Sequence, residues 1–93
     1  SEWVTHTFEV TTAIHEVSSL AKDVETGQRG YLLSGDEVFL VPYAAAVAEL
    51  PRSLDRLATL VSDNATQRAR LVELRHLVDE KLAFSARTLA LHR

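Results

Sequence analysis

Apolar side chains recur every seven residues through the first third of the chain, and this spacing restricts the possible folds more than any other feature. Two interleaved sets follow it: Trp3, Val10, Val17, Val24 and Tyr31, and Thr7, Ile14, Ala21 and Gln28. Seven residues make almost two turns of an α-helix, so the two sets form one stripe that packs against neighbouring helices at a shallow angle. The spacing predicts a long helix over residues 2–34, ended by Gly35, which tolerates a left-handed C-cap.

The rest of the chain repeats this kind of pattern twice. A second seven-residue frame predicts a helix over residues 36–62, with apolar positions at Leu40, Tyr43, Val47, Leu50, Leu54, Leu57 and Val61. Ser34 and Glu37 have the spacing of a capping box at its start. Pro42 falls in the first turns of this helix, and Pro51 predicts a kink rather than a break.

After a short polar interruption, Asn64 is the expected N-cap of a third helix over residues 65–92. Its apolar stripe consists of Leu71, Leu74, Val78, Leu82, Ser85 and Leu89. No alternation typical of β-strands occurs anywhere. The predicted fold class is therefore all-α, with three long helices in an antiparallel helical bundle.

Composition restricts the classes of function. A chain of 93 residues forms one domain, and its net charge of −3, with both signs interspersed, is unlike the basic stripe of a nucleic-acid-binding protein. There is no cysteine, so neither a disulfide nor a thiolate metal site is expected. The longest nearly apolar stretch, Val38 to Ala48, is too short to span a bilayer. The chain contains no methionine, which predicts a fragment of a longer protein, although removal of an initiator methionine or of a signal peptide would look the same.

One run of residues places two glycines inside the first predicted helix, where each costs about 1 kcal/mol relative to alanine. The run reads Glu25-Thr26-Gly27-Gln28-Arg29-Gly30-Tyr31-Leu32-Leu33-Ser34-Gly35-Asp36. It resembles the signature of the CHASE-type extracellular sensory domain, type three, and departs from it only at Ser34, where that family has threonine. Agreement continues through Phe39-Leu40, Pro42-Tyr43 and Asp63-Asn64 with Gln67, so the resemblance covers most of the chain.

The resemblance implies a non-catalytic sensor module of a bacterial transmembrane receptor, of the histidine kinase or cyclase type. It places the domain on the periplasmic or extracellular side of the inner membrane, between flanking membrane spans. It also implies a four-helix bundle that detects a small-molecule or envelope signal and relays it by helix displacement.

Three antiparallel helices leave the chain ends at opposite poles, whereas a domain between two spans needs both ends at one pole. We therefore expect the fourth helix to be missing from this chain. We also expect its position to be filled by self-association with another copy. Extra apolar surface for that contact comes from Leu77, Phe84, Leu89 and Leu91 on the third helix.

Four residues of the run form the candidate ligand site: Thr26, Gln28, Arg29 and Tyr31. Arg29 offers a planar guanidinium to a carboxylate or phosphate, yet it lies four residues after Glu25 and can pair with it instead. Gln28 falls on the predicted stripe, where a buried amide either lines a polar pocket or sets the helix register. Thr26 can bond its own helix backbone, and Tyr31 can pack against Tyr43 with both hydroxyls in water.

A second group is interpreted as structural: Glu25, Gly27, Gly30, Gly35, Pro42, Tyr43 and Asn64. Within it, Gly27 and Gly30 are expected to let a neighbouring helix approach closely. The histidines lack metal-binding spacing and no nucleophile motif or phosphate-binding loop occurs, so we expect no metal, cofactor or catalysis. The alternative function is a structural helical spacer or dimerisation module without a ligand, which the same spacing would serve.

Overall fold

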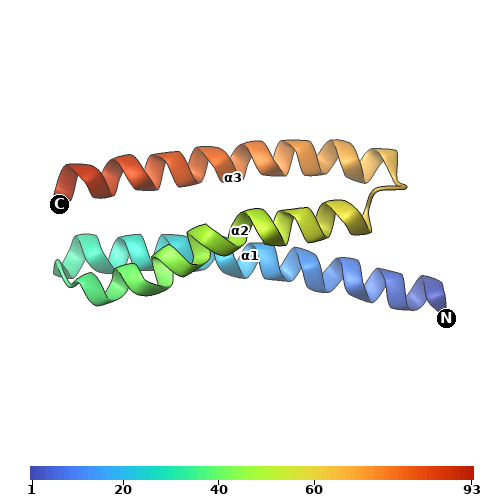
Figure 1. Cartoon of the computed structure of the whole chain (residues 1–93), viewed down its shortest axis with the longest axis horizontal. Helices are drawn as coiled ribbons and strands as arrows, with labels where there is room; N and C mark the ends of the chain where they lie inside the picture. The colour runs from blue at the N-terminus through green and yellow to red at the C-terminus, as the bar shows by residue number, and fades with distance from the viewer.

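The computed structural model describes residues 1–93 and contains three long helices and no strand. Helix α1 spans Glu2–Ser34, α2 spans Leu40–Leu60 and α3 spans Ala65–His92, with a short 3₁₀ turn, η1 (Glu37–Phe39), before α2. Figure 1 shows consecutive helices running in opposite directions along a molecule 49 Å long. The chain is therefore all-α. Its N-terminus lies at the pole of the α2–α3 turn, and its C-terminus at the pole of the α1–α2 turn (Figure 1).

The ends of α1 are set by local hydrogen bonds. The Ser1 hydroxyl accepts the Val4 N–H at 3.2 Å, and the Gly35 N–H donates to the Tyr31 carbonyl at 2.7 Å. Gly35 has a φ of 70°, a left-handed conformation that costs any residue with a Cβ about 1 kcal/mol or more. A side-chain N-cap also begins α3, where the Asn64 side chain accepts the Gln67 N–H at 3.0 Å.

Helix α2 begins later and ends earlier than the predicted range of 36–62. The Ser34 hydroxyl donates to the Gly30 carbonyl at 2.6 Å, so Ser34 still belongs to α1 and the capping box with Glu37 does not form. Instead, the Asp36 carboxylate accepts the Val38 N–H at 2.9 Å and starts η1. From Leu40 onward α2 is continuous through Pro51.

The continuous core lies mainly between α1 and α2. Its buried members are Val10, Ala13, Val17, Val24, Ala46, Leu50, Leu54, Leu57, Val61, Leu71 and Val78. Only the last two of these come from α3. Trp3 was expected on the stripe but is 75% exposed, because the first turns of α1 extend beyond the end of α2 (Figure 1). Leu89 was expected to be surplus surface but is buried, because it lies on the inner face of α3 with Ser85.

Two glycines allow η1 and the start of α2 to lie directly against α1. A Cβ added at Gly27 would lie 2.8 Å from both the Phe39 carbonyl oxygen and the Tyr43 Cβ. A Cβ at Gly30 would lie 2.3 Å from the Phe39 ring. Both distances are far inside van der Waals contact. Close approach of the chain therefore explains why α1 carries glycine at these positions despite its poor helix propensity.

We predict that Gly27→Ala lowers the free energy of unfolding by roughly 1–2 kcal/mol. Overpacking typically costs about 1–3 kcal/mol, which exceeds the gain of about 1 kcal/mol in helix propensity. Gly30→Ala should cost less, because its obstacle is the half-exposed Phe39 ring, which can move, whereas Gly27 faces backbone. Urea unfolding followed by circular dichroism measures both, with exposed Thr26→Ala as the control. Equal stability of wild type and Gly27→Ala would contradict this packing.

Candidate functional site

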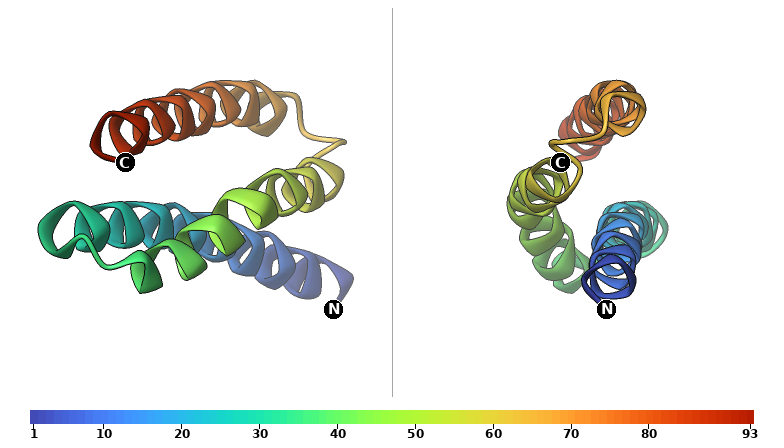
Figure 2. Two further views of the ribbon diagram at one scale, coloured as in Figure 1. Left: turned by 60° about the vertical axis from the view of Figure 1, so that its left-hand side comes forward. Right: turned by 90° about the vertical axis from the view of Figure 1, so that its right-hand side faces the viewer.

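An open groove between α1 and α3 contains two of the concave sites of the molecule. Viewed down the long axis, α2 lies on one side and the space between α1 and α3 opens on the other (Figure 2, right). Two cavities of about 400 Å³ and 310 Å³ lie along this groove. The first is lined by Gln28, Arg29 and Leu32 of α1 and by Lys81 and Phe84 of α3. The volumes of both cavities fall in the range of small-molecule sites.

The second cavity lies nearer the pole of the α2–α3 turn. Ile14 of α1 and Leu74 of α3 form its apolar walls, and Gln67 and Arg70 of α3 supply its polar groups. None of these residues belonged to the candidate site drawn from the sequence. Their shared groove depends on how far α3 lies from α1, and a residue pattern along one helix carries no such information.

The candidate ligand residues divide between this groove and the rest of the domain. Gln28, half-buried, and Arg29, exposed, both line the larger cavity. Thr26 is exposed outside it, and Tyr31 is buried in the helix interface. Thus two of the four residues share one concave surface, and the other two do not contribute to it.

Charged groups at the larger cavity are already partly paired. The Arg29 guanidinium donates to the Glu25 carboxylate at 3.1 Å, the local pairing that was the alternative to ligand binding. Lys81 of α3 reaches the same carboxylate at 3.5 Å and thereby links α3 to α1. The Arg29 and Glu25 side chains are more than half exposed, so their pair is worth only a few tenths of a kcal/mol. A stronger anionic partner can therefore displace Glu25 from Arg29.

A part-buried polar contact joins α2 to α3 at the same end of the groove as the larger cavity. The Tyr43 and Ser85 hydroxyl oxygens are 2.9 Å apart, and the Ser85 hydroxyl already donates to the Leu82 carbonyl at 3.0 Å. Tyr43 is therefore the donor in this pair. The expectation that the Tyr43 hydroxyl stays in water is wrong, because α3 packs over it. A 2.6 Å ion pair between Glu37 and Arg93 secures the same end of α3.

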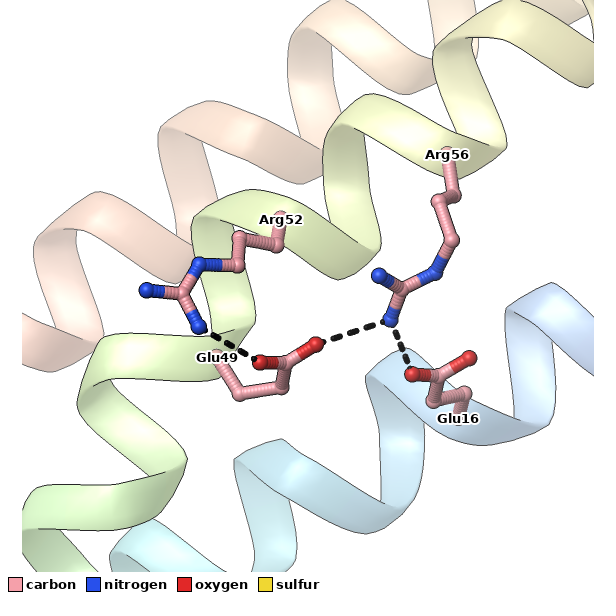
Figure 3. Close-up of polar contacts among 4 residues, drawn as sticks. All are labelled: Glu16, Glu49, Arg52 and Arg56. Carbon is pink, nitrogen blue, oxygen red and sulfur yellow. Dashed lines mark hydrogen bonds and ion pairs between the residues drawn. The ribbon is translucent and has the colours of Figure 1, made fainter.

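A cross-helix ion-pair network lies on the α1–α2 surface (Figure 3). Arg56 of α2 contacts Glu16 of α1 and also Glu49 at 3.0 Å, while Arg52 contacts Glu49 at 3.2 Å. The hydrogen bond from Arg56 holds the pKa of the Glu49 carboxyl below its ordinary value, and Arg52 adds to this effect. The hydrogen bonds to Glu49 and Glu16 raise the pKa of Arg56.

This network was missed at the level of the sequence. The spacing of Glu49 and Arg52 by three residues is a usable signal for a local pair. The contact of Arg56 with Glu16, 40 residues away, depends on the register of α1 against α2. That register follows from the packing at Gly27 and is not visible in either helix alone.

No group of three or more His, Cys, Asp or Glu side chains is arranged to hold a metal ion. None of the three helices combines the length and apolar character needed to cross a lipid bilayer.

The chain is thus an all-α domain with an open groove between its first and third helices. A family model described as the CHASE3 domain matches residues 1–93, and the chain therefore belongs to the CHASE3 family. The resemblance drawn from the run Glu25 to Asp36 is thus confirmed over the whole chain. CHASE3 domains are extracellular, non-catalytic sensory domains. No curated protein and no solved structure gives a significant match.

We predict that Arg56→Met destabilises the domain at neutral pH and that the difference from wild type disappears in acid. A glutamate in the unfolded chain titrates at about pH 4.3. The pKa of Glu49 is lower in the folded domain, so its stabilising contribution is fully present above the unfolded pKa. That contribution is lost as the pH falls through the folded pKa.

Urea unfolding of both proteins between about pH 7 and pH 3 measures the difference. Arg87→Met, which removes an exposed arginine outside any ion pair, is the control and should show a pH-independent difference. A difference between wild type and Arg56→Met that persists unchanged at low pH would contradict the assigned network.

Proposed function

We propose that this CHASE3 domain is the extracytoplasmic sensory input domain of a bacterial transmembrane receptor, of the histidine kinase or cyclase type. It responds to a small-molecule or envelope signal and relays it by displacing α3 relative to the α1–α2 pair. Family membership supports the sensory role, and the unequal packing of the three helices supports the relay.

The main support for this proposal is that α1 and α2 pack more closely with each other than either packs with α3. The α1–α2 pair shares most of the core and is locked at Gly27, where backbone and Cβ atoms leave no room. By contrast, α3 adds only Leu71 and Val78 to that core. Leu74 and Leu82 of α3 pack against that core from outside, and three exposed ion pairs also tie α3 to the pair: Arg75 with Asp55 at 2.7 Å, Lys81 with Glu25 and Arg93 with Glu37.

Exposed ion pairs contribute at most about 1 kcal/mol each, so they re-form in a shifted register at little cost. Packed helices have a few discrete arrangements, between which a shift of 1–2 Å is a known mode of switching. A ligand that binds one arrangement better than the other then changes their populations, and only that difference in affinity matters. The looser helix is the natural moving part.

The larger cavity in the groove suits a small anionic ligand. Arg29 and Lys81 approach it from opposite helices, and Gln28 adds an amide that can donate or accept. Glu25 neutralises one of the two cations in the unliganded domain. A carboxylate or phosphate between Arg29 and Lys81 would replace Glu25 as the link between α1 and α3. Such a bridge changes the position of α3 directly.

Receptor placement also requires a fourth helical position. The chain ends lie at opposite poles, so a domain held between two membrane spans needs one more helix to bring both ends to the membrane. The groove between α1 and α3 is the place for it, because a fourth helix of an antiparallel bundle contacts the first and third. In this placement the Gly35 turn lies at the pole away from the membrane.

A structural spacer or dimerisation module without a ligand is the second candidate function. A row of exposed apolar residues on α3, formed by Leu77, Phe84 and Leu91, favours it. Ligand-dependent stability separates the two functions, because a ligand that binds only the folded state must raise the melting temperature.

We predict that at least one compound in a panel of small carboxylates and phosphates raises the melting temperature of the domain. Arg29→Ala and Lys81→Ala should each abolish the rise. Without ligand they should change the melting temperature by no more than about 2 °C, because exposed pairs add little stability. Arg52→Ala, an exposed arginine outside the groove, should keep the full response. A panel without effect, or a rise that survives Arg29→Ala, would contradict this site.

A further inference from the structure

A third cavity lies at the pole where the N-terminus and the α2–α3 turn are both found (Figure 1). Its volume is about 450 Å³, and only three of its nine lining residues are apolar. It adjoins the smaller cavity of the groove, with which it shares Val10, Ile14 and Gln67. The rest of its lining comes from the first turns of α1 and from the α2–α3 turn. It is therefore a polar site with a composition of its own.

The hydroxyl oxygens that α1 contributes to this cavity can accept hydrogen bonds but have no proton to give. The Thr7 hydroxyl donates to the Trp3 carbonyl at 3.0 Å, and the Thr11 hydroxyl donates to the Thr7 carbonyl at 2.9 Å. A hydroxyl carries a single proton, so each threonine oxygen offers a ligand lone pairs alone. In the α2–α3 turn, the exposed Asp63 carboxylate takes part in no hydrogen bond or ion pair. This lining favours a ligand that donates hydrogen bonds.

Trp3 adds an aromatic face to the same cavity. It is 75% exposed, although most of an indole ring is apolar and is usually buried against other groups. The face of the ring carries a negative partial charge and attracts a cation that lies within about 6 Å of its centre. Tryptophan makes the strongest contact of this kind among the aromatic side chains. An exposed indole beside unpaired oxygen acceptors indicates a positively charged ligand.

Charges around the cavity also favour a cation. No lysine or arginine lines it, and His6 is its only ionisable lining residue besides the carboxylate of the turn. Glu2 and Glu9 lie in an adjoining hollow on α1. In the first turns of α3, Arg68 donates to a backbone carbonyl of the turn at 2.6 Å, and Arg70 lines the smaller cavity instead. The helix dipoles add little, because the negative end of α2 and the positive end of α3 meet in the turn.

We propose that this cavity binds a protonated primary amine. The ammonium group donates to the Asp63 carboxylate and to the hydroxyl oxygen of Thr7 or Thr11. Its positive charge lies against the Trp3 ring. An ammonium group has three N–H donors and no acceptor, which is the complement of this lining. The site goes beyond the proposed function, because it lies at the opposite pole from the larger cavity and takes a ligand of the opposite charge.

The affinity and the source of the amine follow from the position of the site. We expect a dissociation constant on the order of 1 mM, because exposed ion pairs and exposed cation–π contacts each contribute little. A primary ammonium group is supplied either by a free amine or by the ethanolamine headgroup of a lipid. The lipid source rests on the proposed function, which places this pole at the membrane. The site itself does not.

Few side chains of this chain give distinct N–H signals in NMR spectra, which makes the site directly testable. The only side-chain amides are those of Asn64, Gln67 and Gln28, and the only indole is that of Trp3. All of these except Gln28 line the cavity, whereas Gln28 lines the larger cavity. Propylammonium chloride should shift the Trp3, Asn64 and Gln67 signals along one saturation curve below about 20 mM. Gln28 should not shift, and uncharged 1-propanol, of the same shape, should shift none of them.

Two variants separate the contribution of the charge from that of the ring. Asp63→Asn should weaken binding about fivefold, whereas Asp79→Asn, which removes an exposed carboxylate elsewhere on α3, should leave it unchanged. Trp3→Leu should weaken binding about threefold. Phe8→Leu is its matched control, because Phe8 is 71% exposed and lies outside the cavity. Circular dichroism establishes that all four variants keep their helices.

Lipid vesicles distinguish the two sources of the ammonium group. Vesicles that contain phosphatidylethanolamine should shift or broaden the Asn64 and Gln67 signals if the headgroup is the ligand, and vesicles of phosphatidylcholine alone should not. A response to propylammonium without one to either vesicle assigns the site to a free amine.

Three results would overturn the proposal: no saturable shift with propylammonium or with phosphatidylethanolamine, a shift that Gln28 shares, or binding that Asp63→Asn leaves unchanged. The Gln28 signal reports on the larger cavity in the same spectra. Failure of the amine site and failure of the proposed function are therefore distinguishable.

Discussion

Direct contact between α1 and the start of α2 at Gly27 is the constraint on which the rest of the structure depends. It fixes the register of the two helices, because the Phe39 carbonyl and the Tyr43 Cβ occupy the space where any other residue would carry its Cβ. From that register follow the shared core of α1 and α2 and the ion pair of Glu16 with Arg56. The two helices thereby form one closely packed unit.

Helix α3 is held to this unit by contacts of a different kind. It adds Leu71 and Val78 to the core, and Leu74 and Leu82 pack against that core from outside. The other links are exposed ion pairs and one part-buried hydroxyl pair, Tyr43 with Ser85. Exposed charges reorganise easily, whereas a close-packed core does not. The α1–α2 pair is thus packed more closely than α3 is packed against it, and the proposed relay depends on this difference.

Most of the fold could be predicted from the sequence, because its signals are local. Periodicity and caps at Gly35 and Asn64 give the ends of α1 and the start of α3. The start of α2 could not be predicted from spacing, because the Ser34 hydroxyl donates to the Gly30 carbonyl of α1 and accepts the Asp36 N–H instead of the Glu37 N–H. Two of the four candidate ligand residues, Gln28 and Arg29, lie in the groove. Lys81 and Phe84 of α3 also line it, but their position depends on the separation of α1 and α3, which no pattern within one helix encodes.

Native-state amide hydrogen exchange at low protein concentration tests whether α3 is held more weakly than α1 and α2. Buried amides of α1 and α2, such as those of Val24 and Leu50, should exchange only through the opening with the largest free energy. Amides of α3, including that of the buried Val78, should exchange through a separate opening of clearly lower free energy. A single opening free energy shared by Val24, Leu50 and Val78 would show that α3 is as firmly held as the other helices and would contradict the account.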